Sequence, residues 1–234
     1  MTTTILIPGL LCDAIVWQPL MAATPDALVA DLSTQDNLTT MAQDCLAMAE
    51  GTLAVAGHSM GARVALEMAR LAPERIERLV LMDTGIHPLK DGETEKRDAI
   101  IAYAYAEGMQ ALADKWLPGM VYAPNQQNEP LMQSLTDMVL RKDADLHKRQ
   151  ITALVNRPDA SAYLADISCP VLLVVGREDQ WSPVAQHEDM QRLLENSRLE
   201  IIDNAGHFAP VEQPDDVVHV VAPFLNASIT QGGS

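Results

Sequence analysis

Residues 53–71 read LAVAGHSMGARVALEMARL and combine a short apolar run, a tight turn and a helical stretch. The run Leu53–Ala56 is apolar throughout and predicts a buried strand, and a helix is expected from about Ala62 onward. Between them, residues 57–61 read GHSMG, which places a serine on a strand-to-helix turn with a glycine on either side. A Cβ at either glycine would collide with the neighbouring strand and helix. The pattern therefore predicts a strained serine, Ser59, whose hydroxyl projects above a sheet.

The rest of the chain alternates strand-like and helix-like segments. Further strands are predicted at Thr3–Ile7, Ala27–Ala30, Leu79–Met82, Val171–Val175 and Leu199–Ile202. Most of these runs are continuously apolar, which is typical of parallel strands covered on both faces. Helices are expected at Met41–Glu50, Gly61–Leu71, His187–Glu195 and Asp215–Leu225. The alternation predicts an α/β fold with a doubly wound, mainly parallel sheet of about six strands.

The interval between the predicted strands Leu79–Met82 and Val171–Val175 breaks this alternation. It holds four helix-like segments and no convincing strand: Glu93–Glu107, Met109–Trp116, Pro130–Leu140 and Asp145–Val155. A connection of this length without its own structure would be implausible in a compact domain. We therefore expect residues 1–87 and 161–234 to form the core, and residues 88–160 to form a helical insertion on the sheet.

Composition narrows the classes of partner. The 234 residues include 16 basic and 32 acidic side chains, giving a net charge of −16, which repels nucleic acid and anionic membranes. No apolar stretch is long enough to span a bilayer, and no basic segment precedes the first apolar run. A cytoplasmic, soluble protein without nucleic-acid or membrane partners is expected. Cys12, Cys45 and Cys169 lack the spacing of a zinc cluster or a disulfide framework and are expected to be reduced.

A serine hydroxyl is a poor nucleophile until a base takes its proton, so one of the six histidines is needed. His207 directly follows the last predicted strand, at the sheet edge where sites form, and is predicted to be that base. His58 lies inside the serine turn and is expected to pack or bond locally, whereas His87 is expected near the mouth of the site. The helical histidines are interpreted as surface residues: His147, His187 and His219.

The base in turn needs a carboxylate that holds its tautomer and stabilises its charged form. Asp179 lies just past the strand Val171–Val175, and the order Ser59, Asp179, His207 is the one expected for this architecture. Asp83, at the end of the strand Leu79–Met82, is the rival, because it reaches the same edge. Glu178 is expected to face elsewhere.

Two backbone N–H groups are predicted to stabilise the oxyanion of a tetrahedral intermediate. One is that of Met60, at the start of the helix that follows the serine. The other belongs to the loop after the first strand, where Leu10 is preferred and Leu11 is the alternative. Neither a metal nor an organic cofactor is implied.

Together these segments resemble the α/β-hydrolase superfamily, in its compact esterase-like branch, over nearly the whole chain. The resemblance rests on PGLL at residues 8–11, GHSMG at 57–61, PERI at 73–76, Gly176-x-x-Asp179 and Gly206-His207 before Glu212-x-Pro214. It implies a nucleophile–acid–base triad on Ser59, Asp179 and His207 beneath a helical lid. This chain departs from the family pattern in having Pro8-Gly9 for the usual His-Gly, and the family's antiparallel hairpin is not expected before the first predicted strand.

The insertion supplies many methionine, aromatic and aliphatic side chains: Met109, Trp116, Leu117, Met120, Val121, Tyr122, Leu131, Met132, Leu135 and Met138. Most are expected to be core, while some should line an acyl pocket, because flexible methionines adapt to varied shapes. The predicted pocket residues are Leu11, Trp116, Met120 and Met132. The arginines are interpreted as scattered and solvated: Arg63, Arg97, Arg141 and Arg157.

The residues thus predict a serine hydrolase acting on a small-molecule carboxylic ester with a small to medium apolar acyl group. Thioester, enol-lactone and carbon–carbon bond hydrolysis use the same groups and stay open. In the family, carbon–carbon cleavage normally has a cationic lid group, so Arg97 or Arg141 inside the pocket would favour it. A non-catalytic binding protein that keeps the triad is the alternative from another class. The chain is expected to be a monomer or a homodimer.

Overall fold

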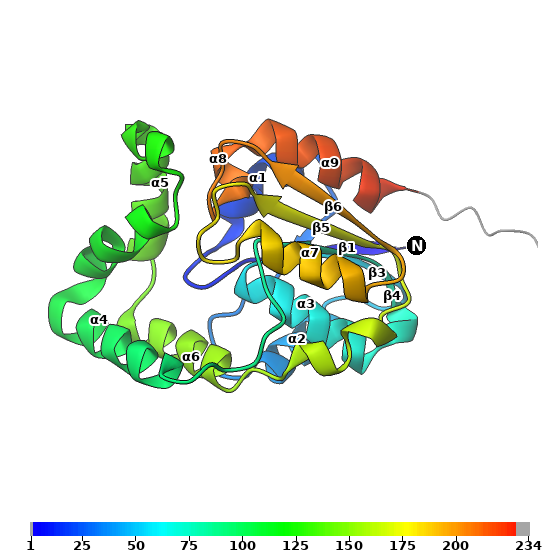
Figure 1. Cartoon of the computed structure of the whole chain (residues 1–234), viewed down its shortest axis with the longest axis horizontal. Coiled ribbons are helices and arrows are strands. Elements are labelled where there is room, and N and C mark those ends of the chain that lie inside the picture. Colours follow the sequence, from blue (N-terminus) through cyan, green and yellow to red (C-terminus); the bar gives the residue numbers. More distant parts are fainter. Residues whose placement is uncertain (1, 228–234) are drawn as a thin grey trace, which may run out of the picture.

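The computed structural model describes residues 2–227 and consists of one sheet between two layers of helices, with a helical arch to one side (Figure 1). The strands are β1 (Thr3–Ile7), β2 (Leu28–Val29), β3 (Leu53–His58), β4 (Ile76–Met82), β5 (Val171–Gly176) and β6 (Ser197–Ile202). All neighbouring strands pair in parallel, in the order β2-β1-β3-β4-β5-β6. The predicted fold class, with six parallel strands, is confirmed.

Helices cover both faces of the sheet. The helices of the core are α1 (Gln18–Ala23), α2 (Leu38–Ala47), α3 (Met60–Leu71), α7 (Val184–Leu193), α8 (Ala209–Glu212) and α9 (Pro214–Asn226). In Figure 1, α1 and α9 lie on one face of the sheet, and α2, α3 and α7 lie on the other. The sequence did not indicate α1, because its six residues are too few to display a helical period.

Burial follows the position of each strand in the sheet. Every residue of the interior strands β3 and β5 is buried, which explains why their sequences are apolar apart from His58 at the end of β3. The edge strand β6 is only partly buried, and it carries charged residues at Arg198 and Glu200. Burying one Val or Leu side chain contributes roughly 1.5–3 kcal/mol. The interior strands therefore form a rigid platform for the loops at their carboxyl ends.

The insertion between β4 and β5 is helical, and Figure 1 shows it beyond the arrowheads of the strands. Its main helices are α4 (Glu93–Trp116), α5 (Glu129–Leu140) and α6 (Ala144–Val155). The helix α4 is broken at Gly108, whose φ of 85° and ψ of 173° are not helical. The break coincides with the predicted boundary between Glu93–Glu107 and Met109–Trp116.

Within the described part of the chain, none of the helices has the length and apolarity that crossing a membrane requires. The three cysteines are free thiols: Cys12 and Cys45 are buried and Cys169 is partly buried.

Candidate active site

The turn after β3 holds Ser59 in a conformation that few residues adopt. Its φ is 55°, in the left-handed region. A Cβ on Gly57 would lie 2.4 Å from the carbonyl oxygen of Gly61, and one on Gly61 would lie 2.1 Å from that of Ile7. The N–H of Ser59 donates to the carbonyl of Met82 at 2.8 Å, which ties the turn to β4. The two glycines are therefore required by close packing, as the sequence predicted.

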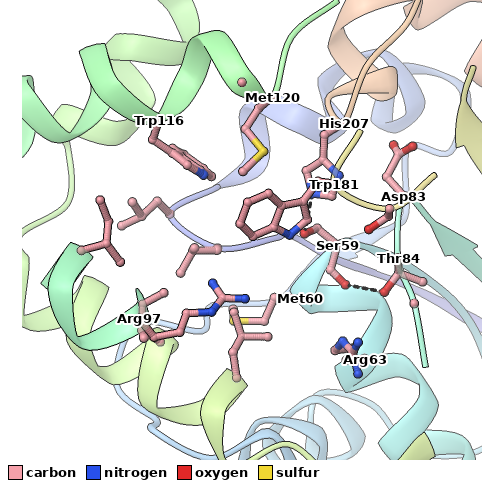
Figure 2. Close-up of a pocket in the computed structure, with 18 of the residues that line it drawn as sticks. Ser59, Met60, Arg63, Asp83, Thr84, Arg97, Trp116, Met120, Trp181 and His207 are labelled. Carbon is pink, nitrogen blue, oxygen red and sulfur yellow. Dashed lines mark hydrogen bonds between the residues drawn. The ribbon is translucent and has the colours of Figure 1, made fainter. Parts of the chain in front are cut away.

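Three predicted side chains meet at the carboxyl edge of the sheet. His207 Nε2 lies 2.8 Å from Ser59 Oγ, and His207 Nδ1 lies 2.8 Å from Asp179 Oδ2 (Figure 2 shows the first pair). An ionised carboxylate only accepts hydrogen bonds, so Nδ1 carries the proton. Nε2 is then free to accept the hydrogen of the Ser59 hydroxyl. This arrangement allows the imidazole to deprotonate the hydroxyl as it attacks.

The surroundings of Asp179 keep it ionised. Its other oxygen accepts the N–H groups of Trp181 and Ser182, each at 2.8 Å. Burial acts to raise the pKa of Asp179, but the charge and hydrogen bond of His207, together with these two N–H groups, hold the pKa below its usual value. Asp179 therefore accepts three hydrogen bonds and is held in one orientation.

The rival carboxylate, Asp83, has a different environment. It is fully buried, and its Oδ1 accepts the N–H of Gly176 at 2.8 Å. Its Oδ2 lies 3.8 Å from His58 Nε2 and has no hydrogen-bond partner among the described residues. Burial, reinforced by the charge of Asp179, raises its pKa well above the usual value. Asp83 has no described hydrogen bond to His207, whereas Asp179 does.

His58 supports the loop of the base from below. Its Nε2 donates to the backbone carbonyl of His207 at 2.7 Å, and its buried Nδ1 has no partner among the described residues. Burial, followed by the neighbouring charge of His207, lowers the pKa of His58 to about 3. The ring is therefore neutral, and it bonds locally, as expected from the sequence.

The loop that carries His207 is hydrogen-bonded to the segment of the lid between α4 and α5. The N–H of His207 donates to the carbonyl of Met120 at 2.7 Å. The carboxylate of Glu212 accepts the N–H of Gly206 at 2.9 Å with one oxygen and that of Tyr122 at 2.8 Å with the other. Lid and core therefore share a buried hydrogen-bond network directly behind the imidazole.

The geometry distinguishes the two candidate donors in the loop after β1. The N–H of Leu11, which has a φ of 58°, is occupied: it donates to Gln150 Oε1 at 2.8 Å. Gln150 lies on α6, and its Nε2 donates to the carbonyl of Leu32 at 3.1 Å. Within residues 2–227, the N–H groups of Leu10 and Met60 have no hydrogen-bond acceptor. Leu10 is therefore the better placed donor, and sequence reasoning gave no sign of Gln150.

A cavity of about 660 Å³ lies above Ser59, between the sheet edge and the lid. Of the predicted pocket residues, Leu11, Trp116 and Met120 line it. Met132 lies outside it, because α5 packs on α4 and turns this side chain against the core. Trp181, half exposed at the mouth, was not predicted.

The arginines are not scattered, contrary to the sequence-based interpretation. Arg63, Arg97 and Arg157 all line the cavity, and only Arg141 is at the surface, where it pairs with Asp13 at 2.9 Å. Arg63 lies four residues after Ser59 in α3, so helical spacing alone placed it near the nucleophile. The other two come from the insertion, and their convergence depends on how it docks.

Two histidines that were expected at the surface are buried. His147 is 2% exposed, and His187 is fully buried and accepts the N–H of Thr84 at 3.1 Å. Burial lowers the pKa of each to about 4, so both are neutral. Across residues 2–227 there is no group of three or more His, Cys, Asp or Glu side chains that could hold a metal ion. His87 lines the cavity, in agreement with the expectation.

Solved structures share this architecture. The thermophilic esterase from Thermogutta terrifontis has a TM-score of 0.88 and 25% identity, and the match covers 96% of this chain and 89% of the esterase. The enol-lactonase from Burkholderia xenovorans LB400 has a TM-score of 0.84 and 22% identity, over 97% of this chain and 90% of the lactonase. The second likeness concerns the fold alone.

Sequence comparison finds further relatives. A 2-hydroxy-6-oxononadienedioate/2-hydroxy-6-oxononatrienedioate hydrolase of Pseudomonas putida is 29% identical over 177 residues, covering 73% of this chain. The chain spans 62% to 65% of the length of the first curated relatives that it matches. The model of the Alpha/beta hydrolase family matches residues 5–220. With the parallel sheet, the glycine-flanked serine turn and this match, the chain belongs to the Alpha/beta hydrolase family.

Proposed function

We propose that this chain hydrolyses carboxylic esters of small molecules through a covalent acyl-enzyme on Ser59. The observation that carries the proposal is the continuous hydrogen-bonded series Ser59–His207–Asp179, which opens into the cavity at its serine end. The similarity to the Thermogutta terrifontis esterase supports it. Within residues 2–227, we propose that residues 88–160 act as a lid over this site and that the remaining residues form the catalytic core; residues 1 and 228–234 lie outside the described residues.

The proposed reaction has two halves. Ser59 Oγ attacks the ester carbonyl carbon while its proton passes to His207 Nε2, and Asp179 stabilises the imidazolium that forms. The N–H groups of Leu10 and Met60 bind the oxyanion. The bond to the alcohol then breaks, and the alcohol leaves with the proton from His207. A water molecule, deprotonated by the same imidazole, attacks the acyl-enzyme and releases the carboxylic acid and Ser59.

The cavity suits a substrate with an apolar part. Trp116 and Met120 face it from the lid, and Leu11 and Phe208 from the core. These side chains would bury an apolar group of small to medium size, since drug-sized ligand pockets occupy roughly 300–1,000 Å³. Water exclusion by the lid would also strengthen the hydrogen bonds to the oxyanion.

A second candidate is hydrolysis of a carbon–carbon bond beside a carbonyl. The specific observation in its favour is Arg97, a lid residue that lines the cavity. The Pseudomonas putida relative is named for cleavage of a dioate. A direct comparison of turnover on an ester and on a 1,5-diketone acid, each at equal concentration, would distinguish the two candidates.

The test of the main proposal uses short-chain p-nitrophenyl esters and a fluorophosphonate probe. The wild-type protein is expected to hydrolyse the esters and to be labelled at Ser59, and Ser59→Ala is expected to lose both responses. Ser161→Ala, at an exposed serine, is the matched control and should retain both. Mass spectrometry locates the label. A protein that neither turns over esters nor reacts with the probe would instead be a non-catalytic member of the family.

A further inference from the structure

Basic side chains outnumber acidic ones among the residues that line the active-site cavity. The basic residues that line it are Arg63, Lys90, Lys96, Arg97, Lys115 and Arg157, against only three acidic ones, Asp83, Asp91 and Glu93. The whole chain has twice as many acidic as basic residues, with a net charge of −16. The net charge of the cavity lining is therefore positive, opposite in sign to that of the whole chain. A positive local field concentrates anions.

Most of this charge is already balanced or solvated. Glu93 binds Arg157 at 2.7 Å and Arg97 at 3.3 Å. Arg157 also donates to backbone carbonyls, including that of Pro88 at 2.8 Å, so its donors are largely occupied. The three lysines are exposed to solvent. These paired or exposed groups contribute to the positive field in the cavity. A different residue has the free donors that could bind an anion.

That residue is Arg63. Its one described hydrogen bond is a contact of 3.3 Å from Nη1 to the carbonyl of His87, and no described carboxylate lies within 4.0 Å of it. Burial, followed by the charge of Arg157, lowers its pKa to about 9, so it remains protonated at neutral pH. A guanidinium has five N–H donors, and buried charges are normally paired. Arg63 thus carries several donors without a partner.

The cavity has an opposite, apolar end. Figure 2 shows Trp116 and Met120 on one side of the pocket and Arg63 on the other, with Ser59 and Trp181 between them. A ligand that spans the cavity past Ser59 would therefore meet apolar surface at one end and a cation at the other.

We infer that the substrate carries a free carboxylate, which Arg63 binds, on the same molecule as the bond that Ser59 attacks. The inference rests on the proposed function and specifies its substrate class: esters with a free carboxylate, such as half-esters of dicarboxylic acids. The planar guanidinium matches a carboxylate with two parallel hydrogen bonds. One unpaired guanidinium balances the single charge of a carboxylate, whereas a dianionic phosphate monoester would remain half uncompensated.

The test compares two substrates that differ only in charge: monoethyl glutarate and the same ester with its free carboxyl replaced by a carboxamide. The measured quantity is the ratio of their kcat/KM values. A hydrogen-bonded ion pair of this kind predicts that the wild-type protein prefers the carboxylate by about 10-fold to 100-fold. About 1 M salt should weaken that preference.

Variants assign the preference to one side chain. Arg63→Gln is expected to reduce the ratio by about 10-fold or more, and Arg63→Lys to restore part of it, because lysine keeps the charge and loses the planar fork. Arg192→Gln, at an exposed arginine on α7, is the matched control and should leave both rates unchanged. A wild-type ratio near unity would overturn the inference even if Arg63→Gln failed to fold.

The outcomes separate this inference from the proposed function. A protein that is labelled at Ser59 and hydrolyses both esters equally is a serine hydrolase without a carboxylate site, which refutes only the inference. Binding provides a readout that is independent of turnover: calorimetry with glutarate on Ser59→Ala should show binding that Arg63→Gln removes. Tighter binding of inorganic phosphate than of glutarate would identify a phosphate site and contradict the assignment to a carboxylate.

Discussion

The carboxyl edge of the sheet and the lid line the same cavity, but they position their side chains by different means. At the edge, Ser59, Asp179 and His207 follow β3, β5 and β6 within five residues of each strand end. In the lid, Arg97, Gln150 and Arg157 come from helices or their flanks and reach the site only because the insertion docks on the core. The sheet edge therefore positions the three groups of the proposed triad, while docking of the insertion determines which further side chains line the cavity.

Backbone strain separates the two regions in the same way. The four described non-glycine residues with positive φ are Leu11, Ser59, Asp83 and Asn204, and each follows a strand at the carboxyl edge. In the lid, positive φ falls on the glycines Gly92 and Gly108. Side chains tolerate such strain only where the surroundings fix the backbone, as paired strands do. The edge is therefore the more rigid region.

The largest expected effect distinguishes the two buried carboxylates at the edge. Asp179→Asn should lower kcat by about 10⁴-fold, because an amide cannot hold His207 in the required tautomer. Asp83→Asn should change kcat by less than about tenfold, since burial favours the protonated form of Asp83, which an amide resembles. Ester hydrolysis by both variants at equal concentration measures this. Equal losses would show that the two carboxylates act as a unit.

A second prediction compares the stability cost of adding a methyl group at the sheet edge and in the lid. Gly61→Ala should destabilise the protein by about 3 kcal/mol or more, because its Cβ would meet the backbone of β1. Gly119→Ala, in the lid, has nothing within 4 Å of the added Cβ and should cost less than about 1 kcal/mol. Urea unfolding gives both free energies. A well-folded Gly61→Ala protein would contradict the packing described for the turn.

The third prediction probes the hydrogen bond by which Gln150 of the lid holds the amide of Leu11 in the loop after β1. Gln150→Leu removes the acceptor for Leu11 N–H and should lower kcat by about tenfold, less than the loss of an oxyanion donor itself. KM should change little, because Gln150 acts through the loop. Gln133→Leu, at an exposed glutamine of α5, serves as the control. A change in KM alone would assign Gln150 to substrate binding instead.

The smallest expected effect concerns pH and the buried histidine of the lid. Burial lowers the pKa of His147 from 6.5 to about 4, so the unfolded chain binds the proton first as the pH falls. Stability is therefore lost on acidification below the unfolded value, and at about pH 5.5 this one group costs about 1 kcal/mol. His147→Gln should show a correspondingly smaller loss between about pH 7.5 and about pH 5.5 in urea unfolding. An identical loss in both proteins would show that His147 is protonated in the fold.

The sequence by itself determined the parallel sheet, the serine turn and the order of the groups that follow the strands. These features depend on short-range signals, namely apolar runs, glycines beside a serine, and polar residues just past a strand end. Parallel strands then bring those ends to one edge without further information. The strand β1, for example, was predicted with its observed bounds, Thr3–Ile7, because strand position is a local property of the sequence.

Only the tertiary structure decided which groups face the cavity. It showed that Gln150 occupies the Leu11 amide, that Met132 turns away from the cavity, and that Arg97 and Arg157 of the insertion reach the cavity that Arg63 of α3 also lines. Each of these outcomes depends on the angle at which the insertion meets the core, and contacts between residues far apart in the chain set that angle. Local sequence patterns do not encode it, because the same apolar helix faces can pack in several ways.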